Sequence, residues 1–171
     1  AQGDKAVLDW DRKGAVAAFE RALLLDPASK VAQRGLRRAA KVGDATAMEW
    51  IGRCIFRGNG VPASSEEKAF KYLARATELG SLSAPVTWGV LLARSGQLAS
   101  AREKFEQAVA RGSSDAHYEL AKIVDSPEEA IEHLRAAADA GHARAMVGLA
   151  SEYLEGIAVP RDAAVAIRLL L

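Results

Sequence analysis

The sequence repeats one short pattern in which an alanine stands eleven residues before a glycine. The segment from Ala69 to Gly80 shows it, with Leu73 at its fifth position and Ala76 three residues later. The same pattern begins again at Ala32, Ala101 and Ala130. Recurrence at a fixed spacing predicts a repeat array, in which each unit buries its apolar face against its neighbours. Arrays of this kind present an extended surface that usually binds other molecules.

The ends of each pattern resemble helix boundaries. A glycine after the last apolar position supplies the left-handed conformation in which helices commonly end. Ser65 before two glutamates, and Ser126 before Pro127, are typical of helix starts. We therefore predict antiparallel helix pairs, without strands, at about 44–57/65–79, 82–95/97–111, 114–124/127–140 and 142–155/162–171.

Composition excludes several classes of function. The 23 Lys and Arg residues nearly balance the 22 Asp and Glu residues, for a net charge of +1, whereas nucleic-acid binding needs a clustered positive excess. Cys54 is the single cysteine, which excludes an intramolecular disulfide and a cysteine-based zinc site. No apolar run approaches the roughly 20 residues that span a bilayer. We expect a chain that binds no nucleic acid and does not span a membrane.

No catalytic or cofactor-binding motif stands out. The histidines, His117, His133 and His142, lack the His-Glu-x-x-His spacing of a zinc enzyme. Glu129 and His133 are four apart and can share a helix face, but one such pair falls far short of a metal site. We expect His117 to be a half-buried packing residue and Cys54 a packed structural thiol. The prediction is a non-enzymatic chain with no cofactor and no metal.

A second pattern precedes each alanine–glycine segment. Residues 45–62 and 142–160 align at several helix-spaced positions, and both end in Val-Pro. The aligned pairs are Ala47 with Ala145, Ile51 with Leu149, Gly52 with Ala150, Ile55 with Tyr153 and Gly58 with Gly156. Over about residues 30–171 these patterns resemble the Sel1-like repeat, a relative of the tetratricopeptide repeat. The resemblance implies an all-α, right-handed superhelix (solenoid) of antiparallel helix pairs.

The resemblance also suggests how the chain is divided. We expect tetratricopeptide-like helices in residues 1–43 and Sel-like repeats in residues 44–171, at about 44–80, 81–112, 113–141 and a truncated 142–171, in one continuous array. Residues 14–27 and 32–43 both look like second helices. Either the helix at 14–26 acts as a first helix completed by 29–42, or the array changes phase near Pro27. We favour the first arrangement, with residues 1–13 in a preceding helix or cap.

In the related tetratricopeptide repeats, first-helix residues that flank the small packing residue line the concave face. Carried over by position, the partner-binding residues are Thr46, Glu49, Arg53, Phe56, Val86, Val90, Tyr118, Lys122, Arg144, Val147 and Ser151. This mixture of polar and apolar side chains suits a peptide, an extended segment or a partner helix. Ordinary solvated positions remain the alternative, and Glu49 and Arg53 have the spacing of an i,i+4 pair that satisfies itself.

The resemblance implies a non-catalytic scaffold or adaptor that binds a partner protein or peptide, as one component of a multi-protein complex. The alternative is a structural subunit of a larger bacterial envelope or secretion assembly. Because bacterial members of the family are often exported, we favour a periplasmic or exported location over a cytoplasmic one.

Overall fold

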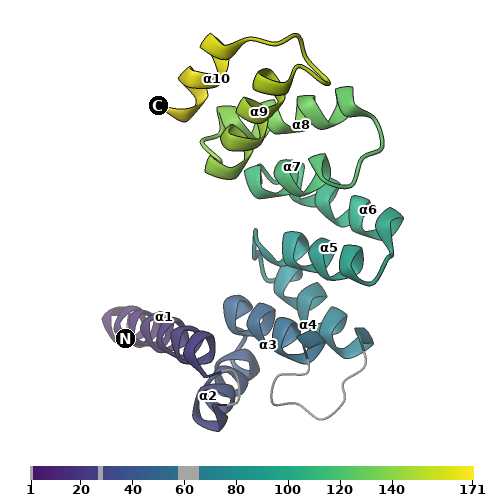
Figure 1. Cartoon of the computed structure of the whole chain (residues 1–171). Helices are drawn as coiled ribbons and strands as arrows, with labels where there is room; N and C mark the ends of the chain where they lie inside the picture. The colour runs from purple at the N-terminus through teal and green to yellow at the C-terminus, as the bar shows by residue number, and fades with distance from the viewer. Residues whose placement is uncertain (1, 27–28, 58–65) are drawn as a thin grey trace. The chain divides into compact units, whose positions relative to one another are not determined.

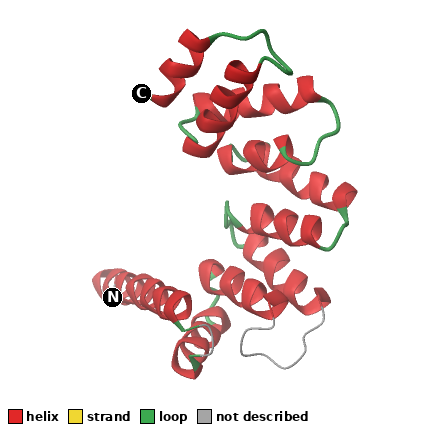
Figure 2. Cartoon of the chain, in the orientation of Figure 1, coloured by secondary structure: helices red, strands yellow, loops and turns green. Residues whose placement is uncertain are grey.

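The computed structural model describes residues 2–26, 29–57 and 66–171, with side chains described from residue 14 onward. These residues form ten α-helices and no strand (Figure 2), which confirms the predicted all-α fold class. The helices are α1 (Gln2–Leu25), α2 (Lys30–Lys41), α3 (Ala45–Arg57), α4 (Glu66–Glu78), α5 (Ala84–Arg94), α6 (Leu98–Val109), α7 (Ser114–Ala121), α8 (Pro127–Asp139), α9 (Ala143–Glu155) and α10 (Ala163–Leu170).

The chain divides into two compact units, Ala1–Thr87 and Trp88–Leu171, called here the N-terminal and C-terminal units. Within each unit, helices that follow one another in sequence pack side by side (Figure 1). In the N-terminal unit α2 packs on α1 and α3, and α3 packs on α4. In the C-terminal unit the packing runs from α6 through α7, α8 and α9 to α10. Packing between sequence neighbours is the arrangement expected of helical repeats.

The repeated apolar residues form the core of each unit. Leu36, Leu73 and Phe105 are almost completely buried, with at most 1% of their surface exposed. Leu134, the fourth residue of this set, is half-buried against the C-terminal cluster. The repeated alanines surround them, and their small side chains allow the helices to approach closely.

The predicted helix ends are confirmed where the structure describes them. Gly43, Gly80, Gly112 and Gly141 have φ of 89°, 90°, 84° and 80°, a conformation that glycine adopts without steric cost. The Ser126 hydroxyl caps α8 by accepting a hydrogen bond from the Glu129 N–H at 3.2 Å. The expected cap at Ser65 lies outside the described residues.

Two expectations about helix bounds need correction. α7 ends at Ala121 rather than near 124, because Ile123 and Val124 both donate to the Leu120 carbonyl in a closing turn. Residues 2–13 do not form a separate helix or cap, since α1 runs unbroken from Gln2 to Leu25 and no proline interrupts it. α1 packs on α2, the pairing expected if the helix at 14–26 acts as a first helix.

Glycines inside the first helices allow especially close contact with the second helices. A Cβ atom added at Gly52 would lie 2.9 Å from Leu73 Cγ, and one at Gly89 would lie 2.5 Å from Phe105 Cε1. Phe105 is fully buried, so its ring cannot swing into solvent to make room. These crossings therefore depend on the absence of a side chain.

We expect Gly89→Ala to destabilise the C-terminal unit by about 1–3 kcal/mol, because overpacking against Phe105 outweighs the roughly 1 kcal/mol gained in helix propensity. Gly148→Ala is the matched control, since a Cβ there meets Leu134 Cδ2 at an ordinary 3.4 Å. Urea unfolding monitored by circular dichroism would measure both. Equal stability changes in the two variants would contradict the steric argument.

Candidate interaction surface

On α3, in the N-terminal unit, the predicted residues differ in exposure. Thr46 is exposed, whereas Arg53 and Phe56 are half-buried. The Arg53 guanidinium lies 4.6 Å from the centroid of the Trp50 ring, in a cation–π contact. Trp50 itself packs on the N-terminal core. The cation at position 53 is therefore held in place by an aromatic side chain of its own helix.

Glu49 does not lie on an open surface. It is only 6% exposed, and its carboxylate accepts hydrogen bonds of 2.6 Å from the Ser83 and Thr87 hydroxyls. The Ser81 hydroxyl donates a third, longer bond of 3.3 Å. These bonds supply the partners that a buried carboxylate needs, and Arg53 is not among them. We therefore treat Glu49 as a packing residue that ties α3 to the start of α5.

An open cavity of about 330 Å³ lies in the N-terminal unit, between α1, the turn before α3 and the end of α4. Its lining includes Glu20, Asp44 and the predicted residue Thr46. Burial, and then the charges of Glu49 and Asp44, raise the pKa of Glu20 above its usual range. Sequence reasoning missed Glu20 and Asp44 because they belong to different elements that only the fold brings together.

In the C-terminal unit the predicted residues on α7 adjoin the start of α9. The Tyr118 ring stacks on the His142 ring, with 4.6 Å between centroids. The Lys122 ammonium lies 5.3 Å from the Tyr118 centroid and 2.6 Å from the Glu119 carboxylate. His142 is also the N-cap of α9, where its Nδ1 accepts from the Ala145 N–H at 3.1 Å. The Tyr118–His142 stack therefore joins α7 to the first turn of α9.

The predicted residues on α9 form an exposed row. Arg144, Val147 and Ser151 are all exposed, and Val147 retains 55% of its surface. On α5, Val86 of the N-terminal unit and Val90 of the C-terminal unit are both half-buried. The most accessible predicted residues are thus Thr46 on α3, Lys122 on α7 and the row on α9.

The described residues offer little for metal or redox chemistry. Among them no group of three His, Cys, Asp or Glu side chains is placed to hold a metal ion. Cys54 is buried, and that burial raises the pKa of its thiol, as expected of an unreactive structural cysteine. In the part of the chain that the structure describes, no helix has the length and apolar character needed to cross a bilayer.

The sequence profile of the Sel1 repeat matches residues 45–81, 114–142 and 143–171, more than half of the chain. The chain therefore belongs to the Sel1 repeat family, and the predicted resemblance is confirmed. The matched segments nearly coincide with three of the repeats expected from the sequence, while the repeat expected at 81–112 corresponds to the pair α5 and α6. Sel1 repeats form a non-enzymatic fold that mediates protein–protein interaction.

Solved bacterial structures share this fold. A Sel1 repeat protein from Oxalobacter formigenes has a TM-score of 0.72 at 20% identity, over 92% of this chain and 70% of that one. The protective antigen c5321 of uropathogenic Escherichia coli, which displays an SLR fold, has a TM-score of 0.64 at 24% identity, over 81% of this chain. The chain spans only 32% of the E. coli protein. At these identities the likeness shows the fold alone. A comparison with curated proteins finds no match.

We expect Glu49→Ala to destabilise the N-terminal unit by about 1–3 kcal/mol, because hydrogen bonds to the buried carboxylate from the exposed Ser83 and the half-buried Thr87 are lost. Glu78→Ala is a suitable control, since it removes an exposed ion pair with Arg75 that contributes at most about 1 kcal/mol. Chemical denaturation of both variants provides the comparison. If Glu49 were an ordinary surface residue, its variant would be no less stable than the control.

Proposed function

We propose that this chain is a non-catalytic scaffold that holds a partner protein or peptide on the concave face formed by its first helices. The observation that carries the proposal is a pair of cations in contact with aromatic rings at equivalent repeat positions. Arg53 follows the small residue Gly52 on α3, and Lys122 follows Ala121 as the C-cap of α7. Each lies against an aromatic ring of its own helix, Trp50 or Tyr118.

This arrangement suits recognition of a partner. Aromatic and arginine side chains supply much of the binding energy in protein interfaces, and ordering them in advance lowers the entropy lost on association. On α9, in the C-terminal unit, Arg144, Val147 and Ser151 are also exposed. A partner that presents carboxylates beside aliphatic side chains complements these groups. Glu49 is left out of the docking residues because its carboxylate is already occupied.

A second candidate is a structural subunit of a larger envelope or secretion assembly, in a periplasmic or exported location. Exposed aliphatic side chains on the last two helices and the segment between them support it. Ile157 retains 75% of its surface, Ile167 56%, Leu170 54% and Leu154 43%. Large apolar side chains left exposed on two packed helices are typical of surfaces that become covered in an assembly.

Matched double variants distinguish these functions. Arg144→Glu with Val147→Ser alters the exposed row on first helix α9, while Arg168→Glu with Ile167→Ser makes the same charge change and a similar loss of an aliphatic side chain on second helix α10. All four side chains are exposed, so both variants are expected to fold. Each protein would be used to capture partners from lysate of the source organism, followed by binding measurements with the purified partner.

The scaffold proposal expects one dominant partner whose affinity falls at least tenfold in the α9 variant and stays unchanged in the α10 variant. The converse pattern would be capture of several subunits of one assembly by the wild type and the α9 variant but not by the α10 variant. That result would favour the function of a structural subunit. Equal affinity for the wild type and the α9 variant would exclude this row from the binding surface.

A further inference from the structure

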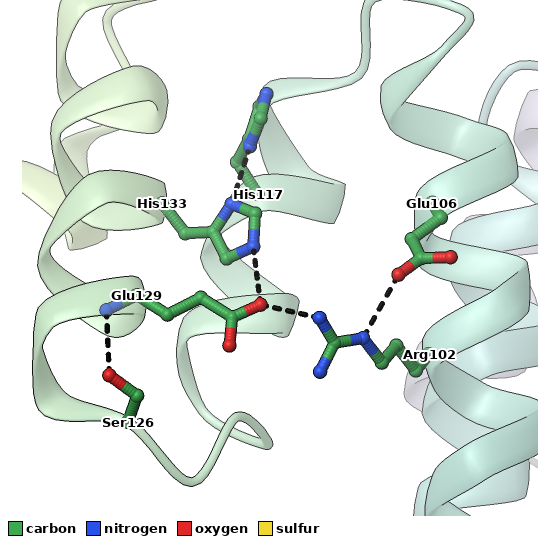
Figure 3. A network of polar contacts seen from close by, with 6 residues as sticks. All are labelled: Arg102, Glu106, His117, Ser126, Glu129 and His133. Atoms are coloured by element: carbon green, nitrogen blue, oxygen red, sulfur yellow. Dashed lines mark hydrogen bonds and ion pairs between the residues drawn. The ribbon is translucent and has the colours of Figure 1, made fainter.

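Two histidines from neighbouring helices form a direct contact in the C-terminal unit. The Nδ1 atoms of His117 on α7 and His133 on α8 lie 3.0 Å apart, and the ring centroids are 5.2 Å apart (Figure 3). Both residues are half-buried. A hydrogen bond between two Nδ1 atoms needs a proton on one and a lone pair on the other. The contact therefore cannot survive when both rings are imidazolium ions.

The surrounding charges determine which ring donates. The Glu129 carboxylate, also on α8, lies 3.9 Å from His133 Nε2 and favours a proton there (Figure 3). Arg102 of α6 bonds the same carboxylate and also Glu106, at 2.9 Å. Glu129 is therefore shared with a permanent cation. A neutral His133 with its proton on Nε2 presents a lone pair at Nδ1, so the His117 Nδ1–H donates to it. As an imidazolium ion, His133 instead donates from Nδ1 and His117 accepts.

Several other ionisable groups on the packed helices have partners of their own. Asp115 of α7 lies 3.2 Å from His142 Nε2, and the Glu119 carboxylate binds Lys122 on the same helix. Between α8 and α9, Arg135 donates to the Tyr153 hydroxyl at 3.0 Å. None of these interactions supplies an anion that would offset a second positive charge on the histidine pair.

We propose that the His117–His133 pair is a proton-sensitive clasp between α7 and α8, closed while at most one ring is an imidazolium ion and opened when both rings are protonated. When both rings are imidazolium ions, each of the two Nδ1 atoms in contact carries an N–H, and two positive rings lie together. The clasp then changes from an attraction to a repulsion between the two helices. This role does not depend on the identity or existence of a partner.

The direction of the pH effect follows from the environment of His117. Burial, and then the charge of His133, lower the pKa of His117 in the folded protein. The unfolded chain, with an ordinary histidine pKa of about 6.5, therefore binds the proton first. The stabilisation is fully present above about pH 6.5 and is lost as the pH falls from there towards the folded pKa.

Hydrogen exchange of α7 and α8 amides at pH 7.5 and 5.5, corrected for the intrinsic exchange rate, tests the clasp. In the wild type we expect the protection of these amides to be up to about tenfold lower at pH 5.5 than at pH 7.5. Tenfold is the limit when the opened state binds one more proton than the closed state over this pH range. In His117→Leu that fall should disappear. His142→Asn keeps a helix cap and leaves the pair intact, so it should respond to pH as the wild type does.

A second variant covers the case in which His117→Leu fails to fold. His133→Gln keeps a neutral donor but removes the neighbouring charge, so the His117 ring should titrate at a higher pH than in the wild type, as followed by NMR of the histidine ring protons. A wild-type His117 that titrates at or above about pH 6.5 would overturn the proposal. So would a loss of protection in His117→Leu equal to that of the wild type.

Discussion

The close crossing of two helices within each repeat is the constraint on which the structure depends. At Gly52 and Gly89 the backbone of a first helix approaches Leu73 or Phe105 so closely that even a methyl group would collide with it. This crossing fixes which face of the first helix is buried. The opposite face is then left for other interactions, because a helix with a single stripe of small, apolar residues can bury only that stripe. Which residues are available for docking therefore depends on this packing as well as on the chemistry of their side chains.

The helix pairs could be predicted from the sequence because each depends on local, repeated signals. Apolar residues three and four apart define the buried stripe, and a glycine of positive φ follows the predicted second helices that end at Gly43, Gly80, Gly112 and Gly141. The unbroken α1 could not be predicted in the same way, since it lacks the repeat pattern. Its irregular sequence suggested a boundary near residue 14 that the backbone does not have.

The interactions of the site residues were less accessible to sequence reasoning because they join residues far apart in the chain. Glu49 has the spacing to pair with Arg53, yet hydroxyls from Ser83 and Thr87 occupy its carboxylate. His133 has the spacing to pair with Glu129, yet its closest polar contact is His117 on another helix. Helical spacing predicts which side chains share a face, but it does not show which neighbouring helix competes for them.

Packing between sequence neighbours also bears on how such a chain folds and evolves. In each unit the helices chiefly contact the helix before and the helix after, so most native contacts close short loops. Chains dominated by local contacts fold rapidly, because little loop entropy is lost before a contact forms. A helix pair can be gained or lost at modest cost, since only its two flanking interfaces must be rebuilt. The length of the array is therefore free to vary among relatives while the geometry of each pair is retained.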